Sequence, residues 1–137
     1  MFQSWLYVSH SVGWESTAKE RLAQLDVQCR QHNASVGVTG VLLFTGRYFA
    51  QLLEGPTPAV DHLRQKISKD LRHQEVTTLM TKTVAERSCE QWSFVTVFNQ
   101  STFIERIVAQ TIEGDVRRDR TSSNKVLRLL VEYGRVD

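Results

Sequence analysis

The sequence predicts an α+β fold in which one sheet is built in the order β-α-β-β-α-β-β. Three observations predict it. Short apolar or alternating segments typical of strands recur over the first two thirds of the chain, two amphipathic helical stripes separate them, and one tight glycine turn joins two of them as a hairpin. The 137 residues, 41% of them hydrophobic, are enough for one compact domain with its own core.

The first elements are a strand over residues 4–9 and a helix over residues 18–32. Trp5, Tyr7 and Ser9 share one face of the strand because side chains alternate along it. The helix has an apolar stripe at helical spacing, and Thr17 with Glu20 gives the spacing of a capping box. Continuing the stripe places His32 and Asn33 at the inner edge of the helix end.

A hairpin follows, with strands over residues 37–44 and 48–54 around the turn Gly46-Arg47. Phe49, Gln51 and Leu53 share one face of its second strand. The break Gly55-Pro56 then leads to a second helix, with Thr57 as the expected N-cap and proline at the first helical position. The apolar stripe of this helix is Val60, Leu63 and Ile67.

Residues 76–84 and 92–98 alternate well enough for two more strands. Two further helices follow, one after Thr102 that ends at Gly114 and one over residues 126–131 that ends before Gly134. We expect the two crossover helices on one face of the sheet and the C-terminal helices on the other. The predicted division is a core over residues 1–98 and a helical cap of the same domain over residues 99–137.

Composition and motifs narrow the function. A net charge of +2 is too small to favour nucleic acid, and no apolar run approaches the length of a membrane span. Without a signal peptide pattern, we expect a cytoplasmic protein whose Cys29 and Cys89 are reduced thiols. The usual hydrolase, zinc-protease and phosphate-loop motifs are absent and the histidines are dispersed, so we expect neither an enzyme nor a metal site.

The unusual feature is a set of neutral polar side chains at inward positions of apolar elements, namely Tyr7, Ser9, Asn33 and Gln51. A buried amide or phenol needs a hydrogen-bond partner. A polar heterocycle between the two helices would supply such partners, with Leu25, Phe49 and Ile67 packing on its faces. Four unrelated core residues that bond to protein neighbours would explain the pattern too, and spacing alone leaves both explanations open.

Five short motifs, in order and on the expected elements, resemble the BLUF family of flavin-based blue-light sensors. They are Tyr7-Val8-Ser9, His32-Asn33 leading to Val38-Thr39-Gly40, Phe49-Ala50-Gln51-Leu52-Leu53-Glu54-Gly55, Asp70-Leu71-Arg72-His73 and Glu90-Gln91-Trp92-Ser93. The resemblance runs from about Phe2 to Phe98. It implies a ferredoxin-like sheet, FAD held noncovalently between the two helices, and a short member of the family with a helical cap and no fused output domain.

The resemblance also assigns roles. Tyr7 matches the photoactive tyrosine, Gln51 the glutamine between that phenol and the flavin, and Asn33 the asparagine that bonds the flavin's pyrimidine side, with His32 beside it. Four residues match the cofactor end of the second helix: Lys66, Asp70, Arg72 and His73. Trp92 joins the photoactive set, although the sequence leaves open whether it faces Gln51 or solvent.

One position departs from the family pattern. Where most members have methionine two residues after the tryptophan, this chain has Phe94. Phenylalanine is stiffer than methionine and has no sulfur to accept a hydrogen bond from a glutamine amide. We therefore expect the photochemistry to survive, whereas transmission through the fifth strand is in doubt.

The resulting prediction is a blue-light receptor that signals to a separate protein partner or to a second copy of itself. Three rivals share the fold order, one of them an acylphosphatase-like enzyme, for which no arginine phosphate loop is identifiable. A non-photoactive interaction module is suggested by Phe94, and would be colourless and refractory to added FAD. An RNA-binding domain is less favoured because residues 47–51 lack the glycine and aromatic spacing of an RNP1 strand.

Overall fold

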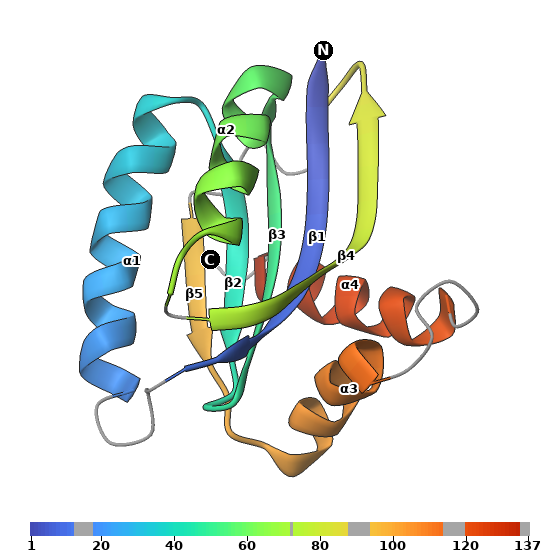
Figure 1. The fold of residues 1–137 in the computed structure, drawn as a ribbon. Coiled ribbons are helices and arrows are strands. Elements are labelled where there is room, and N and C mark those ends of the chain that lie inside the picture. The colour runs from blue at the N-terminus through green and yellow to red at the C-terminus, as the bar shows by residue number, and fades with distance from the viewer. Residues whose placement is uncertain (13–17, 72, 88–93, 114–119, 135–137) are drawn as a thin grey trace.

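The computed structural model describes residues 1–12, 18–71, 73–87, 94–113 and 120–134. The elements follow the predicted order (Figure 1). Their bounds are β1 Phe2–Ser11, α1 Ala18–Ser35, β2 Thr39–Phe44, β3 Tyr48–Pro56, α2 Thr57–Ser68, β4 His73–Val84, β5 Phe94–Phe98, α3 Thr102–Glu113 and α4 Arg120–Gly134.

The five strands form one sheet in the order β4-β1-β3-β2-β5. Neighbouring strands are antiparallel except β2 and β5, which are parallel. Two glycines are required by this geometry. Gly46 turns the β2–β3 hairpin with φ +102°, and a Cβ at Gly40 would overlap the carbonyl oxygen of Leu52 on β3. Together with the helix placement described below, this sheet confirms the predicted α+β fold.

The middle strand, β3, connects the two halves of the sheet. Its Gln51 pairs with Tyr7 of β1 on one side and with Leu42 of β2 on the other, and Leu42 in turn pairs with Thr96 of β5. Since side chains alternate along a strand, Gln51 and its row face one side while Ala50 faces the other. One backbone thus carries residues of both faces.

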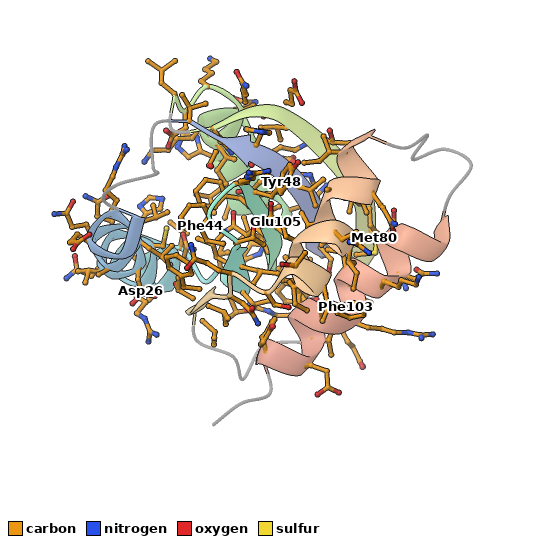
Figure 2. The ribbon with its side chains drawn as sticks, turned by 90° about the horizontal axis from the view of Figure 1, so that it is seen from below. Asp26, Phe44, Tyr48, Met80, Phe103 and Glu105 are labelled. Atoms are coloured by element: carbon orange, nitrogen blue, oxygen red, sulfur yellow. The ribbon has the colours of Figure 1, made fainter. Side chains whose placement is uncertain are left out.

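The helices cover the two faces of the sheet as predicted. α1 and α2 lie on one face, and α3 and α4 lie on the other (Figure 1); the view along the sheet separates the same two layers (Figure 2). The first face buries a cluster that includes Trp5, Tyr7 and Phe49, and the second buries a cluster that includes Ala50 and Leu130. The face under α3 and α4 is called the cap face below.

A buried polar cluster fixes the end of β3. Glu54 is only 1% exposed, and it accepts a hydrogen bond of 2.8 Å from Ser4 on β1. Arg87, after β4, lies 3.8 Å from the Glu54 carboxylate and donates to the backbone oxygens of Glu54 and Gly37 and to the Thr39 hydroxyl. These contacts hold β1, β2 and β3 together at one end of the sheet.

Some element ends differ from the sequence prediction. Thr57 is the first residue of α2 and not its N-cap, which is Pro56; its hydroxyl donates to the Met1 carbonyl instead. α4 begins at Arg120, so part of the segment predicted as a connector is helical. Polar residues at a helix start carry little periodic signal, which explains this error. Thr17, Arg72 and Trp92 lie outside the described residues.

Candidate functional site

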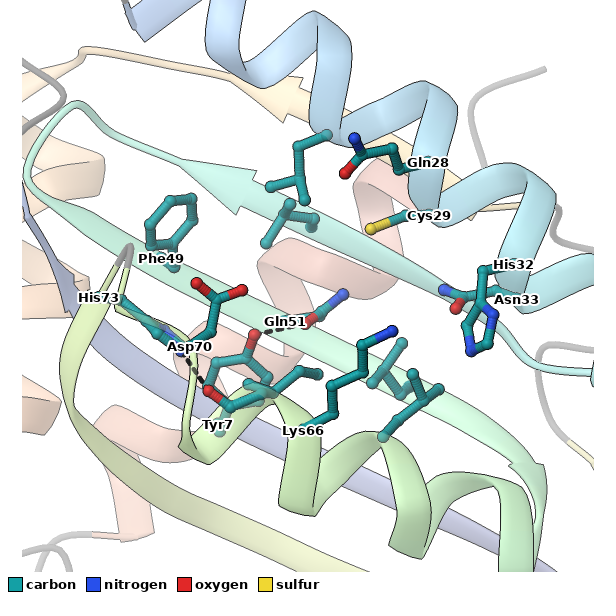
Figure 3. A pocket seen from close by; sticks show the side chains of 15 residues that line it. Tyr7, Gln28, Cys29, His32, Asn33, Phe49, Gln51, Lys66, Asp70 and His73 are labelled. Atoms are coloured by element: carbon teal, nitrogen blue, oxygen red, sulfur yellow. Dashed lines mark hydrogen bonds between the residues drawn. The ribbon is translucent and has the colours of Figure 1, made fainter.

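A pocket opens between α1, α2 and the sheet (Figure 3). Its cavity volume is about 160 Å³, and the pocket is open to solvent on one side. Its lining is mostly apolar, with a few convergent polar groups. The lining residues are Tyr7, Leu25, Gln28, Cys29, His32, Asn33, Leu42, Phe49, Gln51, Leu53, Leu63, Lys66, Ile67, Asp70 and His73.

Tyr7 and Gln51 lie side by side on the floor of this pocket. They are paired across β1 and β3, and the Tyr7 hydroxyl donates a hydrogen bond to Oε1 of Gln51. Both are buried, at 3% and 4% exposed. Because Oε1 faces the phenol, Nε2 of Gln51 points away from Tyr7 (Figure 3), and among the described residues it has no acceptor. Gln51 therefore joins the phenol to the open pocket.

Asn33 brings a second amide to the pocket from the last turn of α1. Its backbone oxygen accepts hydrogen bonds from Val36 and Val38, at 3.2 and 2.8 Å, and so closes the helix and turns the chain toward β2. This closure buries the side chain to 3% exposed. Within the described part of the chain its amide forms no hydrogen bond to a protein group, so it is available to a ligand in the pocket.

His73 is held at the start of β4. Its Nε2 lies 2.6 Å from the carbonyl oxygen of Ile67, and its Nδ1 lies 2.7 Å from the Ser9 hydroxyl. A carbonyl only accepts, so Nε2 carries a proton and, in the neutral ring, Nδ1 accepts from Ser9. The ring also meets Tyr7 and Phe49 edge-on, with centroids 6.1 and 6.0 Å away.

Among the described residues that were predicted to contact the cofactor, Ser9 does not line the pocket. It is fully buried, it is not among the described lining residues, and its hydroxyl is engaged by His73. Direct contact of Ser9 with a cofactor is thus not supported by the pocket. Its contact with His73 gives it an indirect role in shaping the wall.

Charged and polar groups gather at the α2 side and the mouth of the pocket. Lys66 and His32 are exposed, and Asp70 is half-buried (Figure 3). His32 comes from the last turn of α1 and Lys66 from the last turn of α2, whereas Asp70 follows the end of α2; the two helices run in opposite directions over the sheet (Figure 1). Arg72, predicted beside them, lies outside the described residues, as does Trp92.

Sequence reasoning missed part of the lining. Gln28 and Cys29 line the pocket from α1, although the sequence analysis predicts no binding role for either residue. The signal was present, because Leu25, Cys29 and Asn33 recur at a spacing of four and so lie on one side of the helix, with Gln28 three residues after Leu25. Leu42, Leu53 and Leu63 are also lining residues, which an apolar strand or helix pattern cannot distinguish from core. No cluster suited to a metal ion occurs among the described residues.

Comparison with protein families shows which family the chain belongs to. The family model described as "Sensors of blue-light using FAD" matches residues 2–95. The chain belongs to the BLUF family. It is a flavin-based blue-light sensor module, as the sequence resemblance predicted.

Relatives with known names fit this family. The photoactivated adenylate cyclase subunit beta of Euglena longa is 35% identical over 78 residues, which are 53% of this chain and 9% of that protein. The blue light- and temperature-regulated antirepressor BluF of Escherichia coli (strain K12) is 34% identical over 80 residues, 58% of this chain and 19% of that protein. The chain thus spans less than a fifth of the length of either relative.

Solved structures match over nearly the full chain. BlsA in its photo-activated state has a TM-score of 0.74 at 26% identity and covers 100% of this chain and 97% of its own. The dark-state BLUF protein BlrB, at 24% identity and a TM-score of 0.73 with 96% of both chains covered, shows the same fold. None of the described helices is both long and apolar enough to span a membrane.

The pocket residues fit a flavin. Its ring system is a flat heterocycle whose carbonyl and nitrogen edge needs hydrogen bonds and whose faces need apolar contacts. Asn33 and Gln51 present buried amides without protein acceptors among the described residues, and Leu25, Phe49 and Ile67 supply apolar contacts. The amides and the apolar wall together match that division of polar edge and apolar face.

Proposed function

We propose that this chain binds FAD noncovalently between α1 and α2 and reports blue light through the hydrogen bond between Tyr7 and Gln51. The observation that carries this proposal is the position of Gln51, which bonds the buried phenol with Oε1 and turns Nε2 into the pocket. A bound flavin supplies the absorption of blue light and, when excited, a strong one-electron oxidant. Asn33 and Gln51 would bond its polar edge.

The residues can then do the following chemistry. Tyr7 holds its proton on Oη in the bond to Gln51, and a phenol is able to give up one electron together with that proton. A primary amide is both donor and acceptor, so Gln51 can pass a proton and return with its two ends exchanged. After the exchange Nε2 faces Tyr7, whose oxygen also accepts, so both arrangements are satisfied hydrogen-bond networks. Two satisfied arrangements are what a switch requires.

The residues around Tyr7 and Gln51 protect the hydrogen bonds of the site from water. Tyr7, Gln51 and Asn33 are each at most 4% exposed, which keeps water from competing for their hydrogen bonds. His73 closes the pocket beside Tyr7, held by Ser9 and the Ile67 carbonyl. Lys66 and Asp70 at the mouth would meet the polar extension of a flavin nucleotide. These positions support a binding role and no turnover chemistry.

The signal would leave through the cap face, where α3 and α4 pack on the strand that carries Gln51. We propose a separate protein or a second copy of the chain as its receiver, and the cytoplasm as its compartment. The residues 1–98 and 99–137 would then act as the sensing core and the transmitting cap of one domain. A relative described as an antirepressor supports such a protein partner.

The test is an absorption spectrum of the purified, FAD-loaded protein before and after blue illumination. We expect a small red shift that decays in the dark. Tyr7→Phe should keep FAD and lose the shift, whereas the control Tyr48→Phe, on the cap face of β3, should respond as the wild type does. An unshifted wild-type spectrum with FAD bound would overturn the proposed sensing, and a normal shift in Tyr7→Phe would remove Tyr7 from it.

The identity of the nucleotide needs its own measurement. One solved neighbour, BlrP1 of Klebsiella pneumoniae, is described with FMN, whereas the family description names FAD. Mass spectrometry of the cofactor released by denaturing the purified protein should give FAD. Recovery of FMN alone would correct the nucleotide and leave the Tyr7 and Gln51 chemistry unaffected.

A further inference from the structure

Trp5 lies directly behind the Tyr7 ring. The two residues share one face of β1, and their rings are stacked with centroids 4.4 Å apart and planes inclined by 27°. Trp5 is fully buried, and it is not among the described residues that line the pocket. Tyr7 therefore stands between the pocket and a second aromatic ring that is itself readily oxidised by one electron.

The guanidinium of Arg64, on α2, lies over the Trp5 indole. Its guanidinium carbon is 5.3 Å from the Trp5 ring centroid, within the range of a cation–π contact. Its two terminal nitrogens are held by Thr81 and Thr78, at 3.3 and 3.4 Å. Thr78 also accepts the indole N–H of Trp5, at 3.0 Å. One hydroxyl thus fixes both the cation and the ring beneath it.

We propose that Trp5 is a second one-electron donor in this site and that the positive charge of Arg64 disfavours its oxidation. The oxidised residue therefore remains Tyr7. The proposal rests on the proposed function, because the oxidant is the light-excited flavin that first oxidises Tyr7. Contact between the two rings gives a path for an electron from Trp5 to Tyr7, and Arg64 determines how often it is used.

The step that Arg64 suppresses is a one-electron transfer. Trp5 gives one electron to the oxidised Tyr7, the phenolic proton returns to Oη from the Gln51 side, and Tyr7 is a neutral phenol again. Trp5 is left as an indole radical cation whose proton stays on Nε1, because its partner, the Thr78 hydroxyl, is not a base. Because Tyr7 has regained its electron and its proton, Gln51 returns to its original arrangement and no signal is produced.

The positive charge of Arg64 opposes the oxidation of Trp5 electrostatically. A cation favours the neutral, electron-rich indole and disfavours a second positive charge on the same ring. Arg64 is half-buried, so solvent screens part of the effect. From the strength of cation–π contacts, we expect loss of the charge to favour oxidation of Trp5 over Tyr7 by about tenfold.

The test combines single and double variants of the FAD-loaded protein. Arg64→Gln should lower the yield of the red-shifted state several-fold and produce the transient visible absorption of an indole radical cation. Trp5→Phe keeps an aromatic ring on Tyr7 but is hard to oxidise, so alone it should respond like the wild type. Combined with Arg64→Gln it should restore the yield and abolish the indole signal, which assigns that signal to Trp5.

Further variants separate charge from structure. Arg64→Lys keeps the charge and should keep the yield, whereas the neutral Arg64→Met should repeat the result of Arg64→Gln. Arg47→Gln, which removes an exposed arginine from the β2–β3 turn, is the matched control and should change neither readout. If the wild type shifts normally but Arg64→Gln gives no indole radical, or Trp5→Phe fails to rescue it, the inference is wrong. A wild type without a shift contradicts the proposed function instead.

Discussion

The two faces of the sheet solve the same packing problem with different side chains. Under α3 and α4 the buried contacts are almost entirely apolar, with Val108, Val126 and Leu130 completely excluded from solvent. Under α1 and α2 the sheet instead buries Tyr7 and Gln51 beside an open pocket. The cap face thus contributes mainly to stability. The pocket face is less closely packed, and its polar side chains can form hydrogen bonds to a bound ligand.

The largest effect on stability is therefore expected on the cap face. Leu130→Ala removes a fully buried side chain and should lower the free energy of unfolding by about 2–5 kcal/mol, measured by urea denaturation. Flavin binding by the folded protein should persist. Phe103→Ala, at a 70% exposed position of α3, is the control and should change stability by less than about 0.5 kcal/mol. Loss of flavin binding in Leu130→Ala would show that the two faces are not separable.

Flavin removal tests the pocket face. With free FAD at about 100 times its dissociation constant, the folded state should gain about 2.7 kcal/mol over the flavin-free protein. Leu130→Ala should show the same gain in the same titration, because it removes cap-face contacts without displacing β3, and effects of residues that share no contacts are additive. A clearly smaller gain in that variant would reveal coupling between the faces.

Asn33→Leu replaces the pocket amide with an apolar side chain of similar size. Because the amide has no partner among the described residues, the flavin-free protein should lose no stability, whereas FAD affinity should fall about tenfold from the missing hydrogen bond. An FAD titration and a denaturation curve measure the two effects. Gln31→Leu, an exposed neighbour on α1 outside the described lining, should leave the affinity unchanged.

The smallest effect is expected where the sheet meets the cap helices. Asn99, after β5, donates to the Tyr133 hydroxyl at 2.9 Å and accepts from the backbone of Ser101, also at 2.9 Å. Asn99→Ala should cost about 1 kcal/mol and speed hydrogen exchange in α4, with exposed Asn124→Ala as the control. Unchanged exchange in α4 would mean that this contact does not hold the helix.

Strand alternation and helical spacing predicted the elements and their order because each depends on near neighbours in sequence. They also placed Asn33, Gln51 and Phe49 at inward positions, which the pocket confirms. The resemblance added Lys66, Asp70 and His73, which likewise line the pocket. No periodicity in α2 or β4 indicates those three.

Contacts between distant segments could not be predicted. Ser9 and His73 are 64 residues apart, and their hydrogen bond depends on how β4 pairs with β1, whose register shifts twice. The stack of Trp5 on Tyr7 follows from alternation, but the position of Arg64 above it requires the packing of α2 on the sheet. Such register and packing choices are collective properties of the fold and leave no local pattern.

The position of β3 at the centre of the sheet has a thermodynamic consequence. Gln51 touches the pocket and its neighbour Ala50 packs under the cap, so the distance between input and output is the thickness of one strand. Coupling free energies between two binding sites are reciprocal. If flavin binding moves β3 and so changes a partner's affinity for the cap by some factor, that partner changes the affinity for flavin by the same factor. A receiver of the signal could therefore be detected by titrating the chromophore.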